Sequence, residues 1–134
     1  MYLVDTSVFL EIFLRREQSG EAKRFLSRTP FNELYVTDLS LHTLGIILFK
    51  QNMQTAYFQL LNDLFKKGEV WRVQLGTDLT DKIVQIAKKY NLNYVSAYQY
   101  AAAELYDLTL VSYDKVYDQT DRRSKLPGTL LPEE

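Results

Sequence analysis

The stretch Tyr2-Leu3-Val4-Asp5-Thr6-Ser7, at the start of the 134-residue chain, decides the fold. A short apolar run ends on one carboxylate, and two hydroxyl residues and the amphipathic stretch Val8–Leu14 follow it directly. This order predicts a strand, a turn and a helix. In an open parallel α/β sheet, ligands bind in the crevice outside the carboxyl ends of the strands. Asp5 is therefore a candidate ligand of a divalent metal, and Asp5 or Thr6 is equally a candidate helix cap.

Composition fits one domain, residues 1–134, with an irregular tail from about residue 122. Hydrophobic residues make up 46% and charged residues 25% of the chain, which is ordinary for a soluble globular protein. The chain has no cysteine, which excludes disulfides and thiolate metal sites and fits a cytoplasmic location. A net charge of −1 argues against a protein that coats nucleic acid indiscriminately. We find no leader and no apolar run long enough to cross a membrane.

Helical and strand-like segments alternate along the chain. Strands are predicted near Tyr2–Val4, Leu34–Thr37, Val70–Val73 and Thr109–Ser112. Between them, apolar residues recur at helical spacing over Asp38–Phe49 and in a stripe from Tyr57 to Phe65 that Gly68 ends, and Ser96 opens an alanine-rich helix. Helices that separate strands favour right-handed crossovers and a parallel sheet covered on both faces. The predicted fold class is therefore α/β, with a central parallel sheet.

Two carboxylates, Asp5 and Asp114, each follow a predicted strand. Strands from opposite ends of a chain can lie side by side in a doubly wound sheet, which would bring these two acids together. Paired carboxylates suit Mg²⁺ or Mn²⁺, which take oxygen ligands and keep several waters for a phosphate substrate. Since the chain contains a single histidine, His42, any chemistry must rest on carboxylates and hydroxyls.

With these residues in order, the sequence resembles the PIN domain, the nuclease fold of VapC toxins in bacterial and archaeal toxin–antitoxin pairs. Three segments carry the resemblance: Val4–Ser7, the alanine-rich stretch Ala97–Glu104, and Leu110–Asp114. It implies a PIN-like three-layer α/β/α fold and a ribonuclease that uses Mg²⁺ or Mn²⁺. It also implies an RNA substrate, a small antitoxin protein as partner, and a homodimer.

Two positions depart from the family pattern. Thr43 stands where the family has a glutamate on the helix after the second strand, and Ser96 where it has an aspartate before the alanine-rich helix. Asp5 and Asp114 remain as catalytic and metal-binding candidates, and Asp118, one helical turn beyond Asp114, is a candidate substitute. Because the affinity of such a site depends on charge count and ligand geometry, we expect weak metal binding.

Hydroxyl and basic residues complete the set of candidates. The resemblance implies a pocket lined by hydroxyl side chains, namely Thr6, Ser7, Thr43, Ser96 and Ser112, and the basic cluster Arg122, Arg123 and Lys125 is a candidate for RNA or partner contact. Structural interpretations stand beside these: Ser96 as a helix cap, Thr43 bonded back to its own helix, and His42 as a partly buried histidine. Asp38 is a further acid outside the family pattern.

Two functions follow from this set of residues. The first is a toxin-type PIN ribonuclease in which a metal-activated water attacks an RNA phosphodiester. The second is a PIN fold that no longer cleaves and serves as a binding or regulatory module, still dimeric and still binding an antitoxin or RNA. A phosphatase of the haloacid-dehalogenase kind is excluded because Ser7 stands where that family needs a second aspartate. Metal binding and RNA shortening distinguish the first two.

Overall fold

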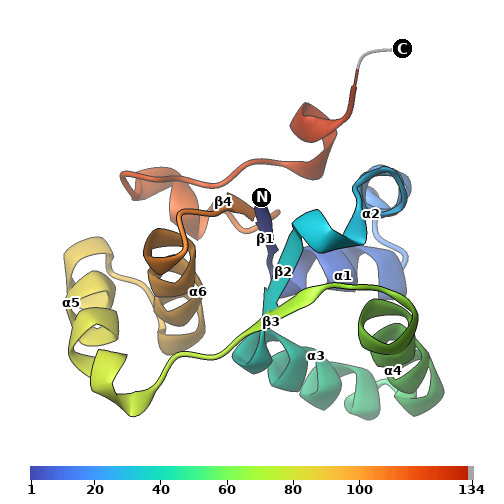
Figure 1. Cartoon of the computed structure of the whole chain (residues 1–134), viewed down its shortest axis with the longest axis horizontal. Coiled ribbons are helices and arrows are strands. Elements are labelled where there is room, and N and C mark those ends of the chain that lie inside the picture. Colours follow the sequence, from blue (N-terminus) through green and yellow to red (C-terminus); the bar gives the residue numbers. More distant parts are fainter. Residues whose placement is uncertain (133–134) are drawn as a thin grey trace.

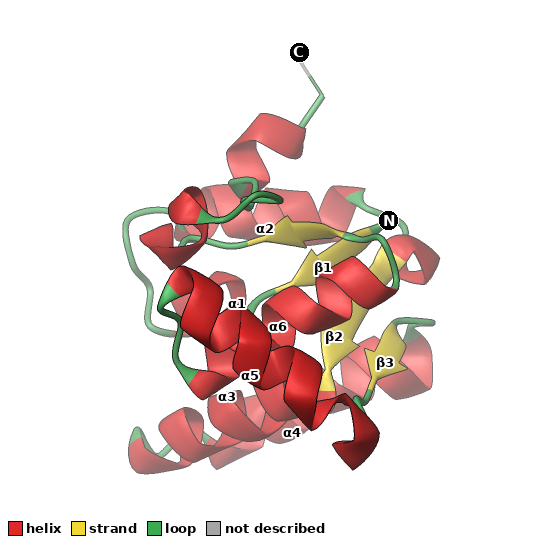
Figure 2. Ribbon diagram, turned by 90° about the vertical axis from the view of Figure 1, so that its left-hand side faces the viewer, coloured by secondary structure: helices red, strands yellow, loops and turns green. Residues whose placement is uncertain are grey.

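The computed structural model describes residues 1–132, and a four-stranded sheet lies at its centre. The strands are β1 (Tyr2–Val4), β2 (Leu34–Thr37), β3 (Trp71–Val73) and β4 (Thr109–Val111), in the order β3-β2-β1-β4. Every neighbouring pair is parallel, as Figure 2 shows for the labelled strands. The predicted parallel sheet is confirmed, and the first and last strands of the chain are neighbours in it.

Six α-helices cover the two faces of this sheet within the described residues. They are α1 (Thr6–Phe13), α2 (Ser19–Arg28), α3 (Asp38–Lys50), α4 (Gln54–Leu61), α5 (Thr80–Tyr90) and α6 (Tyr94–Leu105). Figure 1 shows α5 and α6 on one side of the strands, and α1, α2 and α4 on the other. The arrangement confirms the three-layer α/β/α fold. None of the helices within residues 1–132 has the length and apolar character needed to span a membrane.

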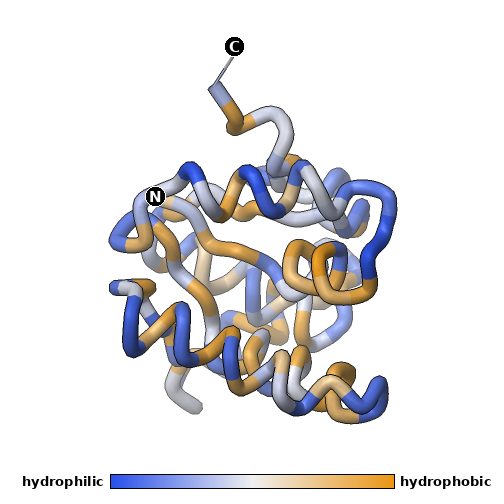
Figure 3. The backbone as a smooth tube through the Cα atoms, turned by 90° about the vertical axis from the view of Figure 1, so that its right-hand side faces the viewer, coloured by the Kyte–Doolittle hydropathy of each residue, from blue (hydrophilic) through white to orange (hydrophobic). Residues whose placement is uncertain are grey.

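The strands divide the core into two clusters because successive side chains of a strand point to opposite faces. Leu3 and Leu110 pack with the small residues of α6, whereas Val4 and Val111 pack with α1 and α3. All four strand residues are almost completely buried, and burying one such side chain stabilises the fold by about 1.5–3 kcal/mol. In Figure 3, segments coloured as hydrophobic run through the middle of the molecule.

The element ends differ from the sequence predictions in ways that local contacts explain. The stripe from Tyr57 to Phe65 spans two elements, α4 and the π-helical segment Asn62–Lys67. Gly68 follows this segment as predicted, with an extended φ of −98°. A Cβ at Gly68 would lie 2.7 Å from the Phe31 ring. Glycine is required at this position because the ring approaches the backbone closely, and not because the backbone is left-handed.

The start of α6 corrects the prediction for Ser96. The helix begins at Tyr94, and the Asn93 side chain accepts a hydrogen bond from the Ser96 N–H at 2.8 Å. Asn93 is therefore the cap, and Ser96 lies within the first turn with its hydroxyl free for other contacts. Asparagine three residues earlier is an equally strong capping residue, which is why the prediction placed the helix start too late.

The segment after β4 contains two short 3₁₀ helices and a stretch that pairs with β4. Asp114 caps a 3₁₀ helix, Lys115–Gln119, and the chain then returns alongside β4. Lys125 donates its N–H to the Leu110 carbonyl at 2.8 Å, and its carbonyl accepts from the Ser112 N–H at 3.0 Å. Another 3₁₀ helix, Pro127–Leu130, packs against α2. The tail therefore covers the outer edge of β4.

Candidate functional site

Asp5 lies at the carboxyl edge of the sheet, directly after β1, and is only 6% exposed. Its Oδ2 accepts hydrogen bonds from the Ser112 hydroxyl at 2.8 Å and the Ser7 hydroxyl at 2.9 Å. A longer contact, 3.4 Å, joins the same oxygen to the Ser7 N–H and makes Asp5 the cap of α1. Its Oδ1 accepts from the Gln99 amide at 3.0 Å. Neutral donors therefore satisfy both oxygens of a buried carboxylate.

The hydrogen bonds continue from Gln99 into β2. The Gln99 Oε1 accepts from the Thr37 hydroxyl at 2.5 Å, and both side chains are 0% exposed. We term Asp5, Ser7, Thr37, Gln99 and Ser112 the Asp5 network. It joins the ends of three strands to α6, so the topology of the sheet assembles it from segments far apart in the sequence. Every buried side-chain nitrogen or oxygen within residues 1–132 has a hydrogen-bond partner.

The loop after β4 is bound to the same network through backbone groups. The Ser112 hydroxyl oxygen accepts from the Asp114 N–H, and the Ser7 hydroxyl oxygen accepts from the Tyr113 N–H, both at 2.9 Å. Asp114 itself is exposed, and its Oδ1 accepts from the Val116 N–H at 3.1 Å. Asp5 and Asp114 therefore lie at the same edge of the sheet, one buried and one open to solvent.

Tyr117 is a residue of this site that the sequence analysis did not identify. It is 1% exposed, and its hydroxyl forms a hydrogen bond with the Ser96 side chain. Burial raises the pKa of Tyr117, the Asp5 charge raises it further, the Ser96 hydrogen bond lowers it and the Asp114 charge raises it. The phenol is thus a neutral group within electrostatic reach of both acids. Its only signal in the sequence is an aromatic residue three positions after Asp114.

Gln99 was also missed, although it forms the central contact of the Asp5 network. The signal available in the sequence is a polar residue inside the alanine-rich helix, three positions after Ser96 and hence on the same face. Ser96 itself is 5% exposed and lies in the site beside Tyr117. The structure therefore brings Ser7, Ser96 and Ser112 to the acidic edge around Asp5.

The other hydroxyl and acidic candidates, Thr43, Thr6 and Asp118, are not part of the Asp5 network. The Thr43 hydroxyl donates to the Leu39 carbonyl of its own helix at 2.8 Å. The Thr6 hydroxyl is 2.7 Å from the Ser40 hydroxyl, which places Thr6 at the junction of α1 and α3. Asp118 is exposed on the 3₁₀ helix Lys115–Gln119. Thr43 thus has the contact expected of a threonine bonded back to its helix.

The carboxyl edge continues past the end of β2 to Asp38. The Tyr98 hydroxyl donates to the Asp38 Oδ1 at 2.9 Å and accepts from the Leu75 N–H at 2.7 Å. Burial raises the pKa of Tyr98 to about 12, with the Leu75 hydrogen bond lowering it and Asp38 raising it. Asp38 is therefore joined to α6 through Tyr98, whereas Asp5 is joined to the same helix through Gln99.

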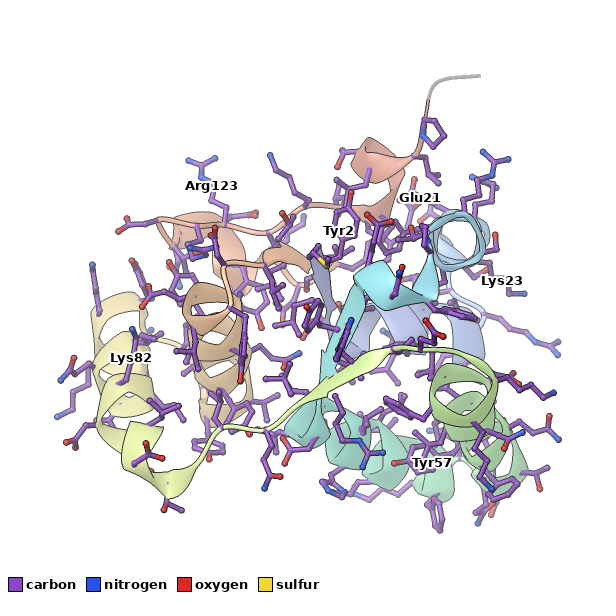
Figure 4. The ribbon with its side chains drawn as sticks, in the orientation of Figure 1. Tyr2, Glu21, Lys23, Tyr57, Lys82 and Arg123 are labelled. Carbon is purple, nitrogen blue, oxygen red and sulfur yellow. The ribbon has the colours of Figure 1, made fainter. Side chains whose placement is uncertain are left out.

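The basic cluster lies along β4 and the tail. The Arg122 guanidinium is 2.8 Å from the Asp107 carboxylate and 3.3 Å from the Leu108 carbonyl, near the amino end of β4. Asp5 follows the carboxyl end of β1, which runs parallel to β4. Arg122 therefore lies at the opposite, amino edge of the sheet. The Arg123 side chain points away from the body of the molecule in Figure 4. Lys125 is exposed beside Val111.

The side chains around Asp5 do not form a divalent metal site. Within residues 1–132, no group of three or more histidine, cysteine, aspartate or glutamate side chains is placed to hold a metal ion. The amide and hydroxyl protons of Gln99, Ser7 and Ser112 point at Asp5, where a cation would have to bind. Mg²⁺ and Mn²⁺ need several oxygen ligands with free lone pairs. The donor set present here therefore fits a hydrogen-bonded carboxylate and not a bound ion.

Comparison with known families agrees with this fold. The family model of the PIN domain matches residues 2–123. The chain belongs to the PIN domain family. No curated protein sequence matches the chain with statistical significance.

Solved structures of toxin–antitoxin proteins are similar to the chain over nearly its whole length. A toxin–antitoxin complex from Klebsiella pneumoniae superposes with a TM-score of 0.74 at 18% identity, covering 95% of this chain and 98% of that one. The Mycobacterium tuberculosis toxin VapC20, which cleaves the sarcin–ricin loop, gives 0.74 at 15% identity over 86% and 91% of the two chains. FitAcB from Neisseria gonorrhoeae gives 0.71 at 18% identity over 97% and 100%. At these identities the similarity shows the fold.

Proposed function

We propose that this protein is a toxin-type PIN protein that binds an antitoxin and hydrolyses RNA slowly or not at all. One observation carries the proposal: neutral donors hold both oxygens of the Asp5 carboxylate, and Thr43 and Ser96 stand where the family pattern has acids. Within residues 1–132 the fold leaves no buried side-chain nitrogen or oxygen without a hydrogen-bond partner, so it is satisfied without those acids. Their absence removes charge that a divalent ion needs.

The surface formed by α3 and α4 supports the binding part of the proposal. A hollow of about 400 Å³ lies there, lined mainly by apolar side chains together with His42, which is exposed and not partly buried as predicted. Ile46 is 59% and Phe49 is 53% exposed on its rim. Figure 4 places Tyr57, another lining residue, between the two helices. We assign this hollow to an apolar helix of the antitoxin, a common mode of peptide recognition.

The binding part is tested with the product of the adjacent reading frame as the antitoxin. Titration calorimetry should give tight binding to the wild-type chain, and the double variant Ile46→Ser with Phe49→Ser should weaken it at least about tenfold, since central apolar contacts dominate such interfaces. Val84→Ser, at an exposed apolar residue of α5, is the matched control and should bind as wild type does. Equal affinity of all three proteins for the antitoxin would show that the antitoxin does not bind in this hollow.

A second candidate, an active Mg²⁺- or Mn²⁺-dependent ribonuclease, is favoured by a different observation. Two acids, Asp5 and Asp114, remain at the carboxyl edge, and both charges act on the Tyr117 hydroxyl. A gel with end-labelled RNA in Mn²⁺ or Mg²⁺ separates the two functions. Brisk cleavage by the wild type that Asp5→Asn abolishes would establish the ribonuclease and contradict our first proposal. Intact RNA in both cases supports the binding protein.

Two further properties belong to this proposal. We propose a homodimer, as in the family, and sedimentation that shows only monomer at tens of micromolar would contradict it. A function on RNA with an antitoxin also places the protein in the cytoplasm. Fractionation of cells that express it at its natural level tests that location.

A further inference from the structure

Gln99 is a fully buried amide in a helix that is otherwise rich in alanine. Its side chain is 0% exposed and bridges Asp5 and Thr37, with its Nε2 donating at 3.0 Å and its Oε1 accepting at 2.5 Å. A buried amide of this size is retained only where its polar atoms are satisfied, and here each end has one partner. The contact is thus a specific link between the sheet edge and α6.

The surrounding hydrogen bonds determine which way the Gln99 amide points. The Thr37 hydroxyl oxygen already accepts from the Ser40 N–H at 3.0 Å, so its own proton is available to donate to Gln99. An ionised carboxylate can only accept, so the NH₂ end of Gln99 must face Asp5, and its carbonyl end then faces Thr37. Gln99 presents a donor to the buried carboxylate on the side opposite Ser7 and Ser112.

We propose that the Gln99 amide takes the place of a cation at Asp5, so that the Asp5 network is stable without metal, and that Gln99→Glu turns it into a metal-dependent cluster. Gln99 is a positioning residue in this proposal. It depends on the proposed function only in that both expect the Asp5 network of the wild type to hold no divalent ion.

The chemistry of Gln99→Glu explains why this substitution should make the Asp5 network depend on a metal ion. Glutamate has nearly the same shape as glutamine, and its Oε1 can still accept from Thr37. Its second oxygen would replace the donor that faces Asp5, which sets two carboxylates about 3 Å apart in a buried site. Such a pair repels unless a proton or a cation joins it. A divalent ion with carboxylate ligands on two sides is the arrangement that hard cations prefer.

The experiment measures melting temperatures of four full-length proteins in EDTA and in millimolar MnCl₂. Wild type should melt at the same temperature in both. Gln99→Glu should melt lower in EDTA, by about 5 °C or more, and recover in Mn²⁺. Gln99→Met, which keeps the size but has no donor, should melt lower and show no recovery. Gln119→Glu, at an exposed glutamine that donates to the Tyr90 carbonyl, is the matched control and should not respond to Mn²⁺.

Each contrary result overturns the proposal. A rise in the wild-type melting temperature with Mn²⁺ would show that Asp5 already binds metal. A Gln99→Glu protein that melts at the wild-type temperature in EDTA, or whose melting temperature does not rise in Mn²⁺, would show that the Gln99 amide does not take the place of a cation at Asp5. Folding of Gln99→Glu only in Mn²⁺ supports the proposal. These results are independent of RNA cleavage and antitoxin binding, so the proposed function stands or fails separately.

Asp5→Asn gives a second measurement that does not depend on the Gln99 variants folding. If the Asp5 network holds the carboxylate by hydrogen bonds, Asp5→Asn loses charge-assisted contacts and melts below wild type in EDTA. If Asp5 is instead an unneutralised acid crowded by Asp114, the same substitution relieves repulsion and melts above wild type. The second result contradicts the proposal.

Discussion

Ser112→Ala is the substitution that most directly tests how Asp5 is held. The Ser112 hydroxyl is 1% exposed, donates to the Asp5 Oδ2 at 2.8 Å and accepts from the Asp114 N–H at 2.9 Å. Alanine removes one oxygen atom and leaves the backbone of β4 and its neighbours unchanged. The substitution therefore breaks these two hydrogen bonds and a third contact, to the Ser7 hydroxyl at 3.1 Å, with little change in packing.

The magnitude follows from the two partners that are left behind. A hydrogen bond to a charged group contributes about 1.5–3 kcal/mol, and a partly buried N–H that loses its acceptor costs about 1 kcal/mol more. The expected loss in the free energy of unfolding is therefore about 2–4 kcal/mol. That is a large share of the roughly 5–15 kcal/mol that stabilises a domain of ordinary size.

Urea unfolding followed by circular dichroism gives this quantity, and the slope of free energy against urea should stay unchanged because the exposed area does not change. Ser27→Ala is the matched control, since the exposed Ser27 hydroxyl donates only to the Arg24 carbonyl at 3.1 Å. Its effect should lie within about 0.5 kcal/mol of zero. If Ser112→Ala costs no more than Ser27→Ala, Asp5 does not depend on this hydroxyl and our account of the site is wrong.

Two further predictions concern the same edge of the sheet. Tyr98→Phe should lower stability at neutral pH. Because the pKa of Tyr98 is raised from 10.0 to about 12, the stabilisation by Tyr98 is complete below pH 10 and is lost between pH 10 and about pH 12. The difference in melting temperature between the two proteins should therefore shrink over that range, and a constant difference would contradict the assignment. Thr43→Glu with Ser96→Asp adds two carboxylates and should tighten Mn²⁺ binding in calorimetry while lowering the melting temperature in EDTA. Unchanged Mn²⁺ affinity would show that these positions do not face Asp5.

The sheet and its two covered faces could be predicted from the sequence because they depend on local patterns. Short apolar runs mark all four strands, and 3.6-residue stripes separate them. The position of Asp5 follows from the same logic, since a residue after a parallel strand must lie at the carboxyl edge. The end of each strand was correct to within one residue, as at Ser112, which the sequence placed inside β4 and the structure places just after it.

The composition of the site could not be predicted because it depends on contacts between distant segments. Thr37 and Gln99 are 62 positions apart, and no local pattern shows that a hydroxyl on one will meet the amide of the other. Arg122 shows the opposite effect. The sequence groups it with Arg123 and Lys125 as a basic cluster, but its pairing with Asp107 holds it at the amino edge of the sheet. Such a partner competes for a cationic side chain in a way that spacing alone does not reveal.

The position of β1 between β2 and β4 has a consequence for the order in which the protein folds during synthesis. The first strand made is central in the sheet, and its partner on one side lies 107 positions later, as the contact between Asp5 and Ser112 shows. Until the ribosome has released β4, one edge of β1 has no partner and the Asp5 carboxylate lacks one of its donors. Long-range pairing of this kind slows folding and exposes apolar strand edges. A nascent chain of this protein therefore carries an unpaired, aggregation-prone edge of β1 until its last strand emerges.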